Sequence, residues 1–520
     1  MLFISPDTYV LSHGALFKKI YNSKSDMGFI VKIGDNTYKL IGSNAKIFQM
    51  IASPFRYRYS IYELTTMLQL TRNEVVYLMF ELLANGVVVK RQEAYYHCPL
   101  FLNKSTFIVK ANHRWVIGNF KTCSVDYIGE EVAMSLLENR IDNIPNNILE
   151  ELYTRNHITN GYALMTTDDY STTVENYLVL TYRCNLTCSY CFEKHAKHDC
   201  DNMGIDVLNS ILKNLNEITE NQTIVLYGGE PLLSSSKKII NRIIDFVSMK
   251  DNFAMRIITN GVNISKYLPL FQRVKKKISS FTITIDGNQS IHDSRRIFHS
   301  GAGTYVRVIR SLKALVANDY TCIIRINLDE NNYNKISDLI KELHQINKKN
   351  LLHVFLARVD NPTDPKFHPI SIKKVIEAYN TIREISNISI ISDIPILQFM
   401  IQYNKTVENE LLFFGQRSNY CSNERINVFD TNGRIYCCNE AMGDSYFEKN
   451  LMGSRLAVSN ITPFTFWKCN NCSVFPLCLG NCPRTNRYIA NCANRCEQAN
   501  IEEALITLCS QLTNIGTIGQ

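Results

Sequence analysis

The stretch that decides the fold is Thr181-Tyr-Arg-Cys-Asn-Leu-Thr-Cys-Ser-Tyr-Cys-Phe192, which carries three cysteines at Cys184, Cys188 and Cys191. It follows directly on the apolar run that begins at Tyr177, and such a run predicts a buried strand. Three thiolates on one short loop can ligate three irons of a [4Fe–4S] cluster, because cysteine sulfur is the usual ligand of such clusters. The fourth iron then keeps a position open for a small molecule.

Structural zinc is the alternative for these cysteines, but it needs four ligands, and the nearest further candidates are His195, His198 and Cys200. The C-x3-C-x2-C spacing, with aromatic Tyr190 before the third cysteine, resembles instead the radical S-adenosylmethionine (SAM) superfamily. The resemblance implies that the open iron binds the amino and carboxylate groups of SAM and that Cys184, Cys188 and Cys191 serve its cleavage to a 5′-deoxyadenosyl radical. The protein orients and encloses that radical.

A second motif, Gly228-Gly229-Glu230, follows the predicted strand 222–227. Two glycines allow backbone carbonyls to approach a ligand closely, and Glu230 offers an acceptor for an ammonium group. The motif is similar to the one that binds the amino group of SAM in this superfamily, which implies a SAM site at these residues. Three polar residues at the ends of later strands are expected either to cap the strands or to contact SAM: Thr259, Asn260 and Thr284.

Strands alternate with helices from about residue 177 to residue 358. Strands are predicted near 177–181, 223–227, 255–258, 280–285, 321–327 and 351–358, and helical faces over 208–218 and 336–346. Alternation of this kind indicates a parallel sheet with covering helices, in which the site lies at the C-terminal ends of the strands. The pattern resembles the partial (β/α)6 barrel of radical SAM enzymes, so the expected fold class is α/β.

A second group of cysteines fills the C-terminal part, after a hairpin turn predicted at Asn432-Gly433. Its spacing resembles the SPASM extension of peptide-modifying radical SAM enzymes, which implies two auxiliary [4Fe–4S] clusters and three clusters in all. By that resemblance, the first cluster takes Cys421, Cys438 and Cys482, and the second takes Cys469, Cys472, Cys478 and Cys496, with Cys492 as the alternative last ligand. Cys437 is a candidate fourth ligand of the first cluster, although neighbours on a strand point to opposite faces. Zinc remains the alternative metal at these sites.

Composition indicates the cellular compartment of the chain and limits the classes of partner it is expected to bind. Of its 17 cysteines, 12 fall in the two groups, and so many free thiols indicate a reducing, cytoplasmic compartment. The sequence starts without a signal peptide pattern and has no apolar stretch long enough to span a membrane. The net charge of +8 is dispersed, and the basic run Lys275–Lys277 is interpreted as a solvated face and not as a nucleic-acid site.

The first hundred residues indicate the class of substrate. Strands are predicted at 28–32, 37–41 and 87–90, with helices at 43–52, from about 60, and from Thr71 to Asn85. This order resembles the winged-helix leader-recognition element of enzymes that modify ribosomally made peptides, where the leader adds a strand to a sheet edge. A DNA-binding winged helix is the rival, but the third helix has few Arg or Lys to read bases.

Four domains are therefore predicted: a winged-helix element (1–100), a bridging α/β element (101–175), the partial barrel (176–400) and the SPASM domain (401–520). The expected function is a maturase that installs an intrapeptide crosslink, a thioether, C–C or C–O bond, in a precursor peptide bound through its leader. Electrons are expected from a donor such as flavodoxin or ferredoxin. The alternative is an anaerobic sulfatase-maturating enzyme, which resembles this chain but carries Asp where Asn439 stands here. A metal-containing DNA-binding regulator would have no use for Gly228-Gly229-Glu230 beside an open cluster.

Overall fold

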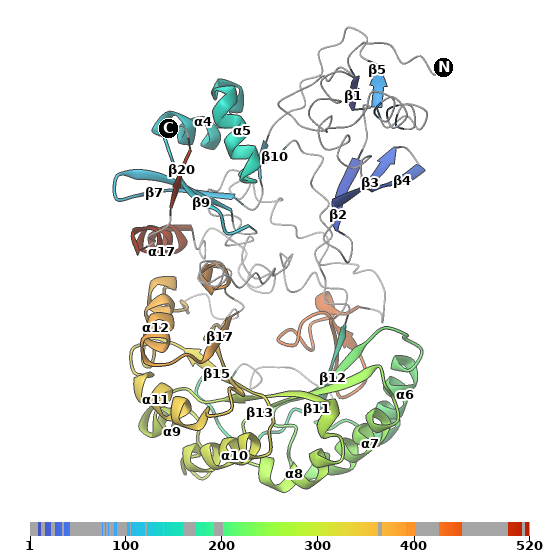
Figure 1. Ribbon diagram of the computed structural model, residues 1–520. Helices are drawn as coiled ribbons and strands as arrows, with labels where there is room; N and C mark the ends of the chain where they lie inside the picture. Colours follow the sequence, from blue (N-terminus) through green and yellow to red (C-terminus); the bar gives the residue numbers. More distant parts are fainter. Residues whose placement is uncertain are drawn as a thin grey trace. The chain divides into compact units, whose positions relative to one another are not determined.

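The computed structural model divides the chain into two compact units, Met1–Asp168 with Cys509–Gln520, and Asp169–Leu508, and each is described by itself (Figure 1). The structure describes residues 9–11, 16–21, 27–33, 36–41, 75, 79, 82, 88–90, 101–103, 106–119, 122–138, 140–159, 173–191, 201–361, 367–392, 394, 396–401, 426–449, 498–511 and 515–518. None of the helices within these ranges combines the length and the apolar character that a membrane crossing requires.

The second unit is built on a nine-stranded sheet with the order β17-β16-β15-β14-β13-β12-β11-β18-β19. Its strands are β11 (Val174–Thr181), β12 (Gln222–Gly228), β13 (Phe253–Thr259), β14 (Ile278–Thr284), β15 (Cys322–Leu328), β16 (Leu352–Arg358), β17 (Ser389–Ser392), β18 (Ile426–Phe429) and β19 (Ile435–Tyr436). All neighbours from β17 to β18 pair in parallel, and β19 returns antiparallel to β18. The six predicted strands and their parallel order are thus confirmed.

Three strands, β17, β18 and β19, extend the sheet beyond the six. The short strand β17 was not predicted, because four residues carry too little periodicity to be distinguished from a loop. Strand β18 belongs to the predicted hairpin around Asn432-Gly433, and Gly433 has a φ of 83° there, as a tight turn requires. The sequence did not predict which strand this hairpin joins. In the structure β18 pairs in parallel with β11, and Glu175 lies opposite Ile426.

Helices cover the outer side of the curved sheet (Figure 1). They are α6 (Ile205–Leu215), α7 (Lys237–Ser248), α8 (Ile264–Gln272), α9 (Gln289–Arg295), α10 (Tyr305–Ala317), α11 (Ser337–Ile346) and α12 (Ile372–Ile385). The helical faces predicted over 208–218 and 336–346 are confirmed as buried stripes of α6 and α11. Burial of such stripes against the sheet provides most of the stability of this layer, at about 25 cal/mol per Å² of apolar surface.

The two faces of the sheet differ in burial, and this difference locates the site. On β13, for example, Met255 and Ile257 face the helices and are fully buried, whereas Arg256 and Ile258 alternate with them and are half-buried. Neighbours along a strand point to opposite faces. At β13 the inner face is therefore partly exposed and carries a charged side chain, whereas the outer face is a closed apolar core.

In the first unit a four-stranded sheet has the order β20-β9-β8-β7. It consists of β7 (Thr106–Ala111), β8 (Arg114–Asn119), β9 (Val125–Ile128) and β20 (Gly516–Thr517), with helices α4 (Glu130–Leu137), α5 (Asn146–Thr154) and the end of α17 (Gln498–Gln511). Strand β20 pairs in parallel with β9. Residues 509–520 thus belong to the first unit, although the sequence groups them with the 401–520 domain.

A buried ion cluster lies where β20 joins β9. Asp126 is fully buried and accepts hydrogen bonds from Arg155 at 2.6 Å and from His157 at 2.8 Å. A Cβ atom at Gly516 would lie 2.2 Å from a carboxylate oxygen of Asp126. Glycine is therefore required at this position by close packing.

The N-terminal residues form two small sheets. Strand β1 (Tyr9–Leu11) pairs antiparallel with β5 (Val88–Lys90), and β2 (Leu16–Tyr21), β3 (Met27–Ile33) and β4 (Asn36–Ile41) form an antiparallel sheet. The strands predicted at 28–32, 37–41 and 87–90 are confirmed, and β1 and β2 were missed. Val75, Met79 and Leu82 are helical and buried, as the third predicted helix requires. The helices predicted at 43–52 and from residue 60 lie outside the described residues.

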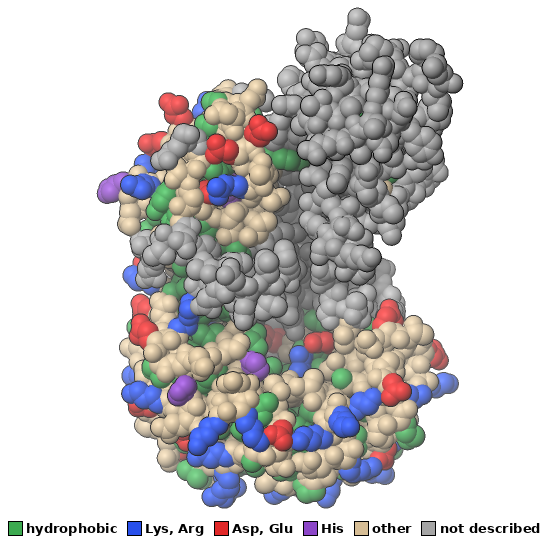
Figure 2. Space-filling view, viewed as in Figure 1, with side chains coloured by type: hydrophobic (Ala, Val, Ile, Leu, Met, Phe, Trp, Pro, Cys, Tyr) green, Lys and Arg blue, Asp and Glu red, His purple; other side chains and the backbone are tan. Residues whose placement is uncertain are grey.

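Charge on the second unit is mixed. Figure 2 shows Lys and Arg side chains spread over its visible face with Asp and Glu among them. The basic run Lys275–Lys277 forms a short 3-10 helix. Lys275 pairs with Asp319 and Lys277 pairs with Asp251, each at 3.5 Å. Acidic side chains of this chain thus partly neutralise the run.

Candidate functional site

The loop after β11 carries the three cysteines of the first motif. Cys188 is buried, Cys184 and Cys191 are half-buried, and all three are free thiols. Backbone hydrogen bonds from Thr187 to the Ile297 carbonyl and from Ser189 to the Arg295 carbonyl, at 2.8 and 3.1 Å, hold the loop against the end of α9. The loop that displays the thiols is therefore fixed by the barrel itself.

The surroundings of these thiols fit a cluster. Burial raises the pKa of the Cys184 thiol to about 12, so without a bound metal the thiol stays protonated. Within the described part of the chain, no three His, Cys, Asp or Glu side chains gather around a single-ion position. Thiolates that each ligate a different iron of a cluster need no such common point. The further zinc candidates His195, His198 and Cys200 lie outside the described residues.

The Gly228-Gly229-Glu230 segment packs against the start of the cysteine loop. Gly229 donates its backbone N–H to the Thr181 carbonyl and Glu230 donates to the Arg183 carbonyl, both at 2.9 Å. A Cβ atom would lie 2.3 Å from the Thr181 oxygen at Gly228, where φ is 125°, and 2.5 Å from the Arg183 oxygen at Gly229. The structure thus gives the two glycines a role that the sequence did not predict, close packing on the protein's own backbone.

Glu230 organises the neighbouring strand end. Its fully buried carboxylate accepts hydrogen bonds from the Thr259 hydroxyl and the Asn260 backbone N–H, both at 2.7 Å, and from the Leu232 N–H at 2.8 Å. Burial raises the pKa of Glu230, and these donors oppose that rise. Three of the roughly four acceptor positions of a carboxylate are used, which leaves one for a ligand ammonium group.

Asn260 connects this segment to the cysteine loop. Its side-chain amide donates to Asn185 Oδ1 at 2.8 Å and lies 3.8 Å from Cys184 Sγ. Thr259 and Asn260 therefore do more than cap β13, since they join the second motif to the first. Thr284, the last residue of β14, is half-buried and makes no side-chain hydrogen bond to the residues that the structure describes.

A buried polar network at the ends of β14 and β15 was missed by the sequence reasoning. The Tyr190 hydroxyl donates to Asp286 and accepts hydrogen bonds from Arg296 at 2.7 Å and from Asn327 at 3.2 Å. The Arg295 guanidinium lies 4.8 Å from the centre of the Tyr190 ring and donates to Asp286 at 3.3 Å. Burial raises the pKa of Tyr190, so the phenol stays protonated. The sequence signal that could have revealed this network is the charge of Asp286, Arg295 and Arg296 close to an apolar strand.

His292 and Asp293 have structural roles in the same region. Burial lowers the pKa of His292 to about 4, so the ring is neutral, and its Nε2 lies 3.0 Å from the Thr304 hydroxyl. The Asp293 carboxylate accepts hydrogen bonds from the backbone N–H groups of Thr304 and Tyr305 at 2.7 and 2.9 Å. The pair thus ties α9 to the start of α10 and closes the loop between these two helices.

The segment after β19 covers part of the inner face of the sheet. Cys437 and Cys438 are both buried in one apolar cluster with Tyr227 of β12. Asn439 donates its side-chain amide to the Tyr227 hydroxyl at 3.0 Å, next to Gly228. Asn439, at which the resemblance to sulfatase-maturating enzymes predicts Asp, therefore lies beside the second motif. The other predicted ligands lie outside the described residues: Cys421, Cys469, Cys472, Cys478, Cys482, Cys492 and Cys496.

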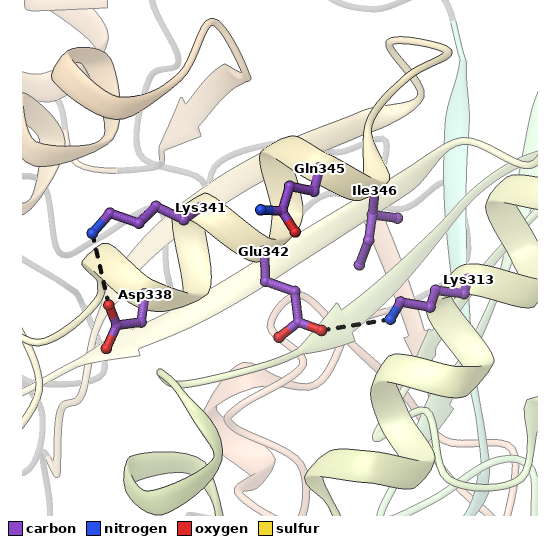
Figure 3. A pocket seen from close by; sticks show the side chains of 6 residues that line it. All are labelled: Lys313, Asp338, Lys341, Glu342, Gln345 and Ile346. Carbon is purple, nitrogen blue, oxygen red and sulfur yellow. Dashed lines mark ion pairs between the residues drawn. The ribbon is translucent and has the colours of Figure 1, made fainter.

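A separate surface hollow lies between α10 and α11 (Figure 3). Its charged side chains pair with one another, Glu342 with Lys313 at 3.7 Å and Asp338 with Lys341 at 3.9 Å. These helices cover the outer side of the sheet, away from the three thiols. We therefore assign it no part in the chemistry.

Comparisons with known proteins agree with this geometry. Residues 178–343 match the family model of the Radical SAM superfamily. The cysteine-type anaerobic sulfatase-maturating enzyme of Clostridium novyi (strain NT) is 26% identical over 338 residues, covering 58% of this chain and 85% of that protein. The antilisterial bacteriocin subtilosin biosynthesis protein AlbA of Bacillus subtilis (strain 168) is 26% identical over 176 residues, which cover 33% of this chain and 36% of AlbA.

Similar solved structures include native anSMEcpe with bound AdoMet, at a TM-score of 0.49 and 18% identity over 65% of this chain and 99% of that one. Streptococcus suis SuiB bound to S-adenosylmethionine follows, at a TM-score of 0.46 and 14% identity over 75% of this chain and 97% of that one. The family match and the parallel sheet with its three-cysteine loop together identify residues 178–343 as a radical SAM enzyme domain.

Proposed function

We propose that the protein is a radical SAM maturase that installs an intrapeptide crosslink, a thioether, C–C or C–O bond, in a ribosomally made precursor peptide. The observation that carries the proposal is the direct contact between the two motifs. Asn260, fixed by Glu230, reaches both Asn185 and the sulfur of Cys184. A ligand held by Gly228–Glu230 would therefore be adjacent to the thiols that hold a cluster.

Different residues of the chain would have different roles in the reaction. Cys184, Cys188 and Cys191 would hold the [4Fe–4S] cluster that, with bound SAM, supplies a 5′-deoxyadenosyl radical. Glu230 and Asn260 would orient SAM through its amino group, and the half-buried inner face of the sheet would receive the peptide. The buried outer core keeps these strand ends in fixed positions, as a reactive radical requires.

The class of substrate rests on the relatives. The Clostridium novyi protein is named for sulfatase maturation and AlbA for bacteriocin biosynthesis, and both names indicate modification of a polypeptide. We infer that residues 1–100 bind the leader of the precursor by strand addition, since antiparallel sheets with edge strands are present there. Flavodoxin or ferredoxin would supply electrons in the cytoplasm. Residues 101–175 would bridge the leader-binding element to the barrel at 176–400.

Two auxiliary [4Fe–4S] clusters in residues 401–520 complete the proposal. Cys421, Cys438 and Cys482 would hold the first, and Cys469, Cys472, Cys478 and Cys496 the second. With only these three ligands, the first auxiliary cluster would keep one iron open, and that iron would bind a substrate thiolate or accept an electron as the ring closes.

A sulfatase-maturating activity is the second candidate, favoured by a match over 85% of the Clostridium novyi enzyme. The structure offers one observation against it. Asn439 stands where those enzymes carry Asp, and its neutral amide is bound to Tyr227 and cannot act as a base. High-resolution mass spectrometry of co-expressed candidate peptides, combined with a hydrazide reagent for the aldehyde, separates the two reactions. The reagent is needed because oxidation of a Ser to formylglycine also removes two hydrogens.

The deciding experiment uses the short reading frame nearest to this one as the precursor. A crosslink lowers the peptide mass by about two hydrogens, with 5′-deoxyadenosine formed alongside. Replacing Cys438 by Ala should abolish the crosslink while some SAM cleavage persists. Conversion of a Cys or Ser to formylglycine in a sulfatase peptide would establish the second candidate instead. A peptide whose mass is unchanged in ordinary water, but which gains deuterium when the reaction is run in heavy water, would contradict both candidates.

A further inference from the structure

The inner face of β15 carries a cation, Arg325, in an open position. Its chain neighbours Ile324 and Ile326 point to the helical side and are fully buried, whereas Arg325 is half-buried on the opposite face. In the sheet register Arg325 lies between Thr284 of β14 and Phe355 of β16. The guanidinium thus lies on the face of the sheet that we assign to the peptide.

The guanidinium is held in a defined orientation. Its Nε donates to Asn327 Oδ1 at 2.8 Å, and its Cζ lies 5.3 Å from the centre of the Phe355 ring. The Asn327 amide in turn donates to the Tyr190 hydroxyl at 3.2 Å. A continuous chain of contacts therefore connects Arg325 to the cysteine loop.

Arg325 differs from Arg256 and Arg295 in having no acidic partner among the described residues. Arg256 pairs with Glu175 at 2.9 Å, and Arg295 pairs with Asp286 at 3.3 Å and with Asp329 at 2.6 Å. Arg325 forms no ion pair with any residue in the described part of the chain. Its two terminal NH2 groups are neither hydrogen-bonded to described residues nor sealed from solvent. They form a planar fork that matches a carboxylate with two parallel hydrogen bonds.

We propose that Arg325 is a specificity residue that binds a side-chain carboxylate, Asp or Glu, of the peptide substrate. The inference rests on the proposed function, because it takes the inner face as the peptide site. The residues proposed for the amino group of SAM lie on β12 and β13, with β14 between them and Arg325. Arg325 lies next to Thr284 in the sheet register, and Thr284 is a candidate SAM contact, so the SAM affinity of Arg325→Gln is measured to separate a peptide carboxylate from that of SAM.

The test uses simple probes, because the peptide is unidentified. Binding of N-acetyl-glutamate amide and of N-acetyl-glutamine amide to the full-length, anaerobically reconstituted protein is compared by saturation-transfer NMR. We expect the wild type to prefer the glutamate probe by about tenfold, as a charge-assisted bidentate pair provides. Arg325→Gln should abolish this preference, and Arg325→Lys should retain part of it.

The matched control is Arg310→Gln, which removes the same charge from an exposed position of α10 and should leave the preference unchanged. SAM affinity is measured on the same samples. Three results overturn the proposal. The wild type shows no preference for glutamate, the preference survives in Arg325→Gln, or the Arg310→Gln control loses it to the same extent. A loss of SAM affinity in Arg325→Gln as large as its loss of affinity for the glutamate probe also overturns the proposal. Failure of the wild type to bind or cleave SAM would instead count against the proposed function, since the probe preference does not require turnover.

Discussion

Tyr190→Phe removes a single hydroxyl from the network that ties the cysteine loop to the barrel. That hydroxyl donates to Asp286 and accepts from Arg296 and Asn327, at 2.7 and 3.2 Å for the two donors. Asp286 is fully buried and Arg296 is 8% exposed, so water does not replace the lost partner. Asp286 keeps hydrogen bonds from Arg295 and from the Asn327 backbone at 3.3 and 3.1 Å, which limits the damage on its side.

The expected magnitude follows from the two charged partners. Hydrogen bonds to charged groups contribute about 1.5–3 kcal/mol each, and the ring of Phe keeps the packing. We therefore expect a loss of about 3 kcal/mol in the free energy of unfolding of the second unit. The second unit runs from Asp169 to Leu508, and at an unfolding entropy of about 2.1 cal/mol/K per residue a loss of that kind lowers its midpoint of thermal unfolding by roughly 4 °C.

Differential scanning calorimetry of the full-length protein checks this expectation, with Tyr320→Phe as the matched control. Tyr320 is 2% exposed, and its hydroxyl has no hydrogen-bond partner among the described residues. Removing that hydroxyl should leave stability unchanged or raise it slightly. A Tyr190→Phe protein that melts within about 1 °C of the wild type would refute the reasoning, and so would equal losses in the two variants.

Three further predictions concern separate parts of the chain. Anaerobically reconstituted protein should hold about 12 irons, and replacing Cys184, Cys188 and Cys191 by Ala should leave about eight by iron assay and abolish SAM cleavage; stoichiometric zinc would contradict the auxiliary clusters. Gly516→Val should displace β20, because a Cβ atom there lies 2.2 Å from Asp126, and should speed hydrogen exchange in β9, whereas Gly129→Ala, with no atom within 4 Å, should not. Residues 1–100 should bind the leader peptide in a pull-down and should not bind random duplex DNA at physiological salt. Deleting them should weaken peptide processing but leave SAM cleavage intact. Tight, salt-sensitive DNA binding would favour a regulator.

Local pattern was sufficient to predict the elements of the barrel. Six strands and the stripes of α6 and α11 follow from hydrophobic periodicity, because a strand or helix that packs on one side must repeat its apolar residues at a fixed interval. The same holds for the cysteine loop, where three ligands lie within eight residues of one another along the chain. Chemistry that is local in sequence can be recognised in sequence.

Contacts between distant segments were decided only by the tertiary structure. Sequence reasoning assigned Gly228 and Gly229 to a ligand, yet both pack against the backbone of Thr181–Arg183. The carboxylate of Glu230 is shared with Thr259 and Asn260, about thirty residues on, and Tyr190 meets Asp286 across 96 positions. No local pattern records such pairs, since each depends on which strands lie side by side.

The inner face of the sheet shows the same division between sequence and structure. The sequence alone determined that Arg325 lies in an apolar strand, where a charged residue is unusual. The register with Thr284 and Phe355 and the missing acidic partner became visible only in the folded chain. The physical reason is that a strand's own residues set its period, whereas the environment of each side chain is set by its neighbours in the sheet.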